Sequence, residues 1–349
     1  MILYYLVICK VVIMEKSRNY NLDFYRGFAA IWIVFIHCCF WSGESYVPQC
    51  VKSLSLFIDV PLFMFISGMT YNYLNSVKKT IKGLVKLYFK YIVFFGIYML
   101  FVLYFDYNSF NFENLKNGLL FKYSDTMPLQ VVGGSMWFMP MYFFVSFFSS
   151  IFISCVDKFV NTKKNLIWFI IIILVFYLIL NFISIPLVLF LKEMTFFIII
   201  YLLGYYAYNN KLSFKKFIII FSSLSLFLII LLLKTDYSFR LMQSYKSVFN
   251  FVYFTYSMLS IFIVWYINSI YKVKNNIVCT IGKNAILFYF AQGVGSSLLL
   301  PVCYRIEIFW AIKLILLFIL NLTYTVLISL MLNGVYKLIE RIKIKNPVS

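Results

Sequence analysis

The sequence has a single histidine, His37, and only 12 acidic residues among its 349. Its seven cysteines form no CxxC pair and show no metal-like spacing. A histidine–cysteine zinc site or a bis-histidine haem is therefore not expected. The sequence also lacks a Gly-rich phosphate loop, a GxSxG turn and a nucleic-acid-binding motif. These absences predict a protein with no metal, no permanently bound cofactor and no nucleic-acid partner.

Hydrophobic side chains are abundant: they make up 63% of the chain, aromatic residues 22% and charged residues only 12%. Apolar runs long enough to cross a bilayer, about 20 residues each, recur along the whole sequence. The pattern predicts an all-α, polytopic membrane protein in which residues 1–349 form one domain. The expected spans are 22–42, 54–75, 85–105, 135–156, 165–183, 187–208, 214–233, 249–270, 281–302 and 308–336.

The charge distribution predicts how these ten helices are oriented. Most of the 31 Lys and Arg residues lie between the apolar runs. With the N-terminus inside, twenty of them fall on the cytoplasmic side, eight on the opposite side and three inside helices. Positively charged loops favour the cytoplasm, so both termini are expected there.

Residues 1–13 form an apolar stretch that resembles a signal peptide. Lys10 interrupts the run, and no small-residue cleavage site follows it. Met14 precedes an ordinary cytoplasmic lead-in, so we interpret 1–13 as a start-site extension. The alternative is a short interfacial helix.

Three ionisable residues occur in the first expected span: Asp23, Arg26 and His37. Such groups are costly in a bilayer, about 2.5–3.5 kcal/mol each at the centre, and often mark function. Arg26 and His37 are eleven residues apart, which places them on one face of a helix about 16 Å apart. Asp23 is close enough to Arg26 to form an ion pair. The alternatives are that Arg26 extends to the membrane surface and that His37 is a packing residue.

Five segments in this order resemble the motifs of the membrane acyltransferase family three. The first-helix segment "LDFYRGFAAIWIVFIH" (22–37) contains an Asp, an Arg-Gly pair and a His at the family's spacing. The other segments are "VPLFMFISGMTY" (60–71), "KKTIKGLVKLYFKY" (78–91), "SMWFMPMYF" (135–143) and "IGKNAILFYFAQ" (281–292). The chain has Lys82 and Lys86 where the family usually has arginines, and Gln292 where a late histidine is frequent.

The resemblance implies an enzyme of about ten helices that transfers acyl groups, usually acetyl from acetyl-CoA, to a hydroxyl of a bacterial surface or exported polysaccharide. His37 would be the catalytic histidine, and Arg26, paired with Asp23, its basic partner. The lysines 79, 82 and 86 would bind the donor's phosphates. The residues expected at the acceptor are Trp137, Ser67 and Gln292, although Trp137 also fits an interfacial belt and Ser67 close helix packing.

Several alternatives stay open at the level of the sequence. His37 could act as a general base or carry the acetyl group covalently. The acceptor could be a glycan or a lipid-linked sugar, and the expected location is the plasma membrane of a bacterium. A glycan flippase or polymerase would also have many helices and basic loops, although transporters tend to spread buried charges over several helices.

Overall fold

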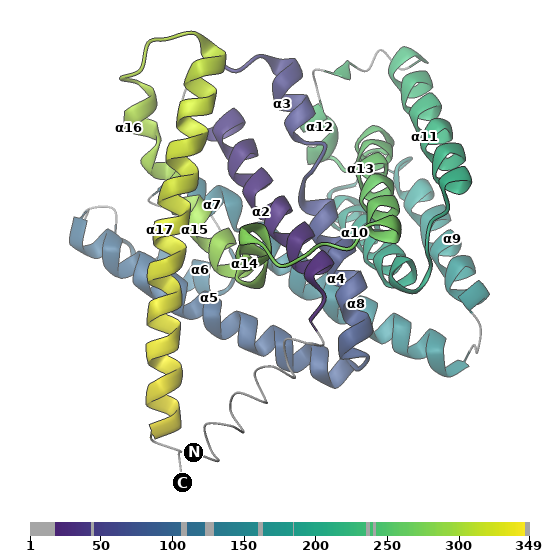
Figure 1. Cartoon of the computed structure of the whole chain (residues 1–349), viewed down its shortest axis with the longest axis horizontal. Coiled ribbons are helices and arrows are strands. Elements are labelled where there is room, and N and C mark those ends of the chain that lie inside the picture. Colours follow the sequence, from purple (N-terminus) through teal and green to yellow (C-terminus); the bar gives the residue numbers. More distant parts are fainter. Residues whose placement is uncertain are drawn as a thin grey trace.

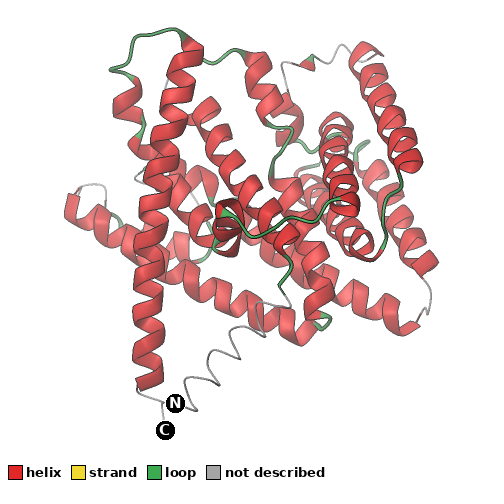
Figure 2. Cartoon of the chain, viewed as in Figure 1, coloured by secondary structure: helices red, strands yellow, loops and turns green. Residues whose placement is uncertain are grey.

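The computed structural model describes residues 18–42, 45–105, 110–122, 129–159, 163–183, 185–234, 238–239 and 242–345. The described chain contains helices and connecting loops and no strand (Figure 2). The helices are α2 (Tyr20–Trp41), α3 (Gln49–Ser55), α4 (Val60–Leu74), α5 (Val77–Phe105), α6 (Phe112–Leu119), α7 (Gln130–Ser135), α8 (Phe138–Phe159), α9 (Lys163–Leu180), α10 (Pro186–Asn209), α11 (Phe214–Lys234), α12 (Met242–Ser247), α13 (Phe251–Ile270), α14 (Ile277–Lys283), α15 (Ala285–Leu298), α16 (Leu300–Cys303) and α17 (Trp310–Lys345). The N-terminal stretch 1–13 lies outside the described residues.

The predicted spans correspond to helices of this structure. Among the described residues, nine helices are long and apolar enough to cross a membrane. The remaining predicted span, 165–183, corresponds to α9, whose apolar part Leu166–Leu180 is shorter. The structure therefore confirms an all-α, multi-pass membrane protein, while the side on which the termini lie stays a prediction.

Three predicted spans are interrupted in the structure, and one of the breaks coincides with a side-chain helix cap. The predicted span 54–75 breaks before α4, because Asp59 caps that helix by accepting the backbone N–H of Val60 at 2.7 Å. The span 281–302 is divided into α14, α15 and α16, with Asn284 at the first junction. The span 135–156 is divided between α7 and α8. Asp59 and Ser135, at two of these breaks, line a cavity, which is where irregular backbone within a membrane span is tolerated.

Two helix crossings bring backbones into direct contact through glycine. A Cβ atom on Gly68 of α4 would overlap the carbonyl oxygen of Tyr201, and one on Gly204 of α10 would overlap that of Phe65. The second crossing joins α2 and α14 through Gly27 and Gly282. Small residues allow this approach, which is the packing role expected for the segment around Gly68.

The helices differ in how far they are enclosed by the rest of the molecule. In the apolar windows of α13 and of residues 285–303, 67% and 61% of residues are buried, compared with 6% in α11. In Figure 1, α2, α4 and α14 lie between α17 on one side and α9 and α11 on the other, and α5 runs along the lower part of the view. The polar residues of the first span are thus carried by a central helix.

Candidate active site

The side chains of Arg26 and His37 line two neighbouring cavities along α2. Arg26 lines a cavity of about 340 Å³, and His37 lines one of about 380 Å³. The two cavities share four lining residues, namely Ile33, Val60, Phe138 and Tyr289. The stripe predicted on the first helix therefore faces two cavities that meet at a common wall.

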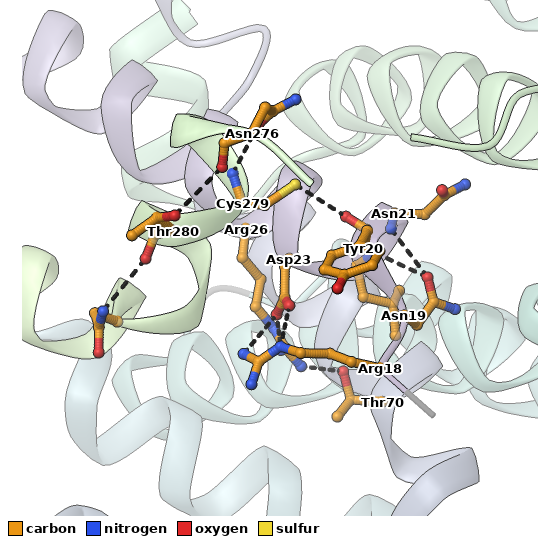
Figure 3. Close-up of polar contacts among 12 residues, drawn as sticks. Arg18, Asn19, Tyr20, Asn21, Asp23, Arg26, Thr70, Asn276, Cys279 and Thr280 are labelled. Atoms are coloured by element: carbon orange, nitrogen blue, oxygen red, sulfur yellow. Dashed lines mark hydrogen bonds and ion pairs between the residues drawn. The ribbon is translucent and has the colours of Figure 1, made fainter. Parts of the chain in front are cut away.

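At the Arg26 cavity, a buried aspartate holds two arginines (Figure 3). The Oδ2 atom of Asp23 lies 2.5 Å from Nε of Arg18, and its Oδ1 atom lies 3.7 Å from Nη1 of Arg26. Arg26 also donates a hydrogen bond to the hydroxyl of Thr70. The predicted pair of Asp23 and Arg26 is present, but Arg18 is the closer cation. One carboxylate between two guanidinium groups leaves a net positive charge, which favours an anion in this cavity.

Lys283 is a second cation of the Arg26 cavity, and the sequence argument assigned it no role. It is the last residue of α14, and its Nζ atom lies 5.7 Å from the ring centroid of Tyr20. The crossing of Gly27 with Gly282 brings their sequence neighbours to one cavity. The sequence does contain the two pairs, Arg26-Gly27 and Gly282-Lys283, but they lie at opposite ends of the chain, so nothing in the sequence indicates that they meet.

Further contacts hold α14 against the start of α2. Asn21 donates to the carbonyl oxygen of Tyr271 at 2.8 Å and accepts the backbone N–H of Val273 at 2.7 Å. Asn276 caps α14 by accepting the N–H of Cys279 at 3.0 Å, and the Cys279 thiol approaches the carbonyl oxygen of Tyr20 (Figure 3). These bonds fix the position from which Lys283 reaches the cavity.

The lysines predicted to bind the donor lie outside this cavity. The side chains of Lys79, Lys82 and Lys86 are exposed. The residues of α5 that line the cavity are Thr80, Gly83, Leu84 and Leu87. The two sets occupy different faces of the helix, so a ligand inside the cavity meets Arg26 and Lys283 rather than the three lysines.

The residues predicted to line the acceptor site are divided among three environments. Ser67 lines the Arg26 cavity, where its hydroxyl donates to the carbonyl oxygen of Phe63 at 2.7 Å. Trp137 lines the His37 cavity. Gln292 lines neither of these cavities; it is 1% exposed, and its side-chain amide has no hydrogen-bond partner in the described chain. Only Trp137 therefore shares a cavity with the histidine.

The long connection after α5 supplies part of the wall around His37. Gly134 and Ser135, at the end of α7, line the cavity. The hydroxyl of Tyr289 donates to the carbonyl oxygen of Ser135 and so ties this wall to α15. Only the last residues of this connection line the cavity, and 106–109 and 123–128 lie outside the described residues.

A buried ion pair forms the polar side of the His37 cavity. Oδ2 of Asp59 lies 2.6 Å from Nζ of Lys246 and accepts the hydroxyl of Tyr253 at 2.8 Å. The carboxylate is nearly inaccessible, whereas 14% of the Lys246 side chain is exposed. The Lys246 ammonium also lies 5.7 Å from the ring centroid of Trp137. Sequence reasoning missed Lys246, because it belongs to a short helix in a loop that carries no motif.

The ring of His37 contacts α15 through its Nδ1 atom. This atom lies 3.5 Å from the hydroxyl of Ser296, which accepts a hydrogen bond from Nδ2 of Asn321 at 2.9 Å. All three residues are buried, with exposed fractions of 9%, 1% and 0%. The other ring nitrogen of His37, Nε2, is therefore the one available to a ligand in the cavity that His37 lines.

The described chain contains no group of three or more His, Cys, Asp and Glu residues that could hold a metal ion. The cavities are instead equipped for an organic ligand, since each has apolar walls and a few polar groups. Cations gather at one cavity, and the histidine, an ion pair and a tryptophan at the other.

Comparison with known families identifies the chain. No curated protein and no solved structure matches it significantly. The model of acyltransferase family three, described as an acyltransferase domain, matches residues 19–334. This match covers nearly the whole described chain, including both cavities and all five motifs. The chain therefore belongs to the membrane acyltransferase family three and is an acyltransferase.

Proposed function

We propose that this membrane acyltransferase transfers an acetyl group from acetyl-CoA to a hydroxyl of a surface glycan or of a lipid-linked sugar. The observation that carries the proposal is the pair of cavities that meet at a wall formed by Ile33, Val60, Phe138 and Tyr289. Cations line one cavity and the histidine lines the other. Such an arrangement suits a reaction whose two substrates arrive separately and react where the cavities meet.

The Arg26 cavity is the proposed donor site. Coenzyme A carries several phosphate groups on a long, narrow pantetheine arm, so its thioester can enter a cavity while its charged end stays near the opening. Arg26 and Lys283 supply positive charge for that end. The exposed lysines 79, 82 and 86 keep a role outside the cavity, because a positive surface raises the local concentration of an anionic ligand.

The His37 cavity is the proposed acceptor site. Sugars offer flat apolar faces to aromatic rings and hydroxyl groups to charged side chains. Trp137 can supply the ring, and Lys246 and Asp59 can supply the polar contacts. These are the features that favour a carbohydrate over a purely apolar acceptor.

In the proposed reaction, His37 acts as general base for direct transfer. The imidazole takes the proton of the sugar hydroxyl, and the oxygen attacks the thioester carbonyl carbon. The new C–O bond forms, the C–S bond breaks, and the electron pair leaves on the sulfur of coenzyme A. The proton held by His37 then neutralises the thiolate, which regenerates the base. Exclusion of water by the buried site protects the thioester from hydrolysis.

The test uses purified protein in lipid nanodiscs with radiolabelled acetyl-CoA and glycans extracted from the native membrane. We expect acceptor-dependent release of free coenzyme A and label on the glycan. His37→Ala should abolish both, because no other histidine is available in the chain. The matched control is Lys337→Ala, far along the chain in α17. Transfer at the wild-type rate by His37→Ala would refute the catalytic assignment, and no consumption of acetyl-CoA by the wild type in the presence of acceptor would refute acetyl-CoA as the donor.

A further inference from the structure

We propose that Ser296 is a positioning residue that, supported by Asn321, holds the proton of neutral His37 on Nδ1 and leaves Nε2 free for the acceptor hydroxyl. The inference deepens the proposed function, because it explains how a single histidine becomes a base of defined orientation. It assigns a role to two residues that lie outside the five sequence motifs.

The geometry around the ring supports this assignment. The Nδ1 atom of His37 lies 3.5 Å from the Ser296 hydroxyl, which is the upper limit of a hydrogen bond, and contacts of catalytic groups are often this long before substrate binds. Asn321 donates from Nδ2 to the same hydroxyl at 2.9 Å, and its Oδ1 accepts the hydroxyl of Thr325 at 3.4 Å. The serine is thus held between α2 and α17.

The close approach of α17 to α15 depends on a small residue. A Cβ atom on Gly295 would lie 2.9 Å from both Oδ1 of Asn321 and Oγ1 of Thr325. A larger side chain at position 295 would therefore displace the two polar groups that support Ser296. The segment "GVGSS" (293–297) therefore both packs α15 against α17 and supplies the serine that contacts the histidine.

The direction of the hydrogen bond follows from the chemistry of the proposed base. A neutral imidazole carries one proton, and the nitrogen that takes the substrate proton must have a free lone pair. A hydroxyl oxygen has two acceptor positions, and in Ser296 one of them takes the Asn321 N–H. The other can take Nδ1–H of His37, which leaves the lone pair on Nε2. The partner of the second nitrogen commonly sets the tautomer of a functional histidine.

The next residue shows what a serine with only a structural role looks like here. Ser297 is equally buried, but its hydroxyl donates back to the carbonyl oxygen of Gly293 at 3.0 Å within the same helix. Ser297→Ala is therefore a matched control for Ser296→Ala, since both remove one buried hydroxyl from adjacent positions of α15.

The primary test is nuclear magnetic resonance on ¹⁵N-histidine-labelled protein in nanodiscs, purified with a tag that contains no histidine. Because the chain has one histidine, one pair of ring nitrogens reports on His37 alone. We expect chemical shifts of the Nδ1–H tautomer in the wild type and in Ser297→Ala, and a mixed or Nε2–H population in Ser296→Ala. The Nε2–H tautomer in the wild type would overturn the proposal without any variant.

The second test separates positioning from packing by kinetics. For Ser296→Ala we expect kcat to fall about 10- to 100-fold, the range known for removing the hydrogen-bond partner of a metal-ligating histidine, with little change in KM for acetyl-CoA. Ser297→Ala should keep wild-type kcat. An unchanged tautomer together with an unchanged kcat in Ser296→Ala would refute the role. The tautomer measurement needs neither donor nor acceptor, so it can succeed even if acetyl transfer itself is not observed.

Discussion

At the scale of single residues, the site depends on charges whose partners come from distant parts of the chain. Asp23 is buried between Arg18 and Arg26, and Asp59 is buried against Lys246. Removing one member of such a buried pair leaves an uncompensated charge and costs about 3–5 kcal/mol. Substitutions of these aspartates therefore test folding together with function, whereas the partly exposed cations at the cavities test binding more directly.

Lys283 allows such a test at the proposed donor site. We expect Lys283→Ala to raise KM for acetyl-CoA by about 10- to 100-fold, since a charge-assisted hydrogen bond to phosphate contributes about 1.5–3 kcal/mol. Lys82→Ala is the matched control, because it removes the same side chain from an exposed position outside the cavity. The measurement is coenzyme A release at varied acetyl-CoA concentration.

The effect of Lys82→Ala should stay within about threefold and disappear at high salt, because exposed charges are screened. If Lys82→Ala raised KM more than Lys283→Ala, the donor would bind at the basic face of α5, as the sequence motif alone suggested.

At the scale of helices, the glycine crossing of α2 with α14 decides where the cations meet. Gly282 approaches the backbone of Asp23, and Gly27 approaches that of Val278. The Arg-Gly and Gly-Lys pairs of the sequence are therefore two halves of one contact. A side chain at either glycine would separate Arg26 from Lys283, even though neither cation is itself altered.

This contact predicts a marked difference between two Gly→Ala variants. Gly282→Ala should lower the free energy of unfolding by about 1–3 kcal/mol, because the new Cβ would overlap backbone atoms that cannot rotate away. Gly334→Ala, in α17, has no atom within 4 Å of the new Cβ and should be neutral or slightly stabilising. Thermal unfolding in detergent, followed by circular dichroism, measures both. Equal melting temperatures would show that α2 and α14 can move apart without cost.

At the scale of the whole molecule, the orientation in the membrane can be tested with cysteine labelling. Cys50 is exposed in α3, which lies at the end of the molecule opposite the C-terminal end of α17 (Figure 1). The charge distribution places Cys50 outside the cell and the exposed Lys211, between α10 and α11, in the cytoplasm. Both positions can be probed from one side with a membrane-impermeant maleimide.

We expect intact cells to label Cys50 in a Cys9→Ser, Cys155→Ser background, which removes the cysteine of residues 1–17 and the other exposed cysteine. Lys211→Cys, with Cys50→Ser added, should react only after the membrane is permeabilised. The reverse pattern would contradict the predicted orientation and would place the Arg26 cavity on the side that lacks acetyl-CoA.

Much of the fold follows from the sequence by itself. Apolar runs of bilayer length specify membrane helices, because backbone polar groups in lipid must be satisfied within each helix. Helical periodicity places Arg26 and His37 on one face of α2, and the motifs indicate an acyltransferase, in agreement with the family match. These features depend on local spacing, which one sequence displays directly.

Only the tertiary structure decided which other residues share the site. Lys283, Lys246 and Ser296 come from three helices distant from α2 in the chain, and each is brought to a cavity or to His37 by helix packing. The same packing directs Lys79, Lys82 and Lys86 away from the Arg26 cavity, although they are sequence neighbours of the α5 residues that line it. The physical reason is that packing between helices far apart in the chain depends on side-chain volume, and above all on where glycine lets two backbones touch. Such contacts produce no local periodicity in the sequence.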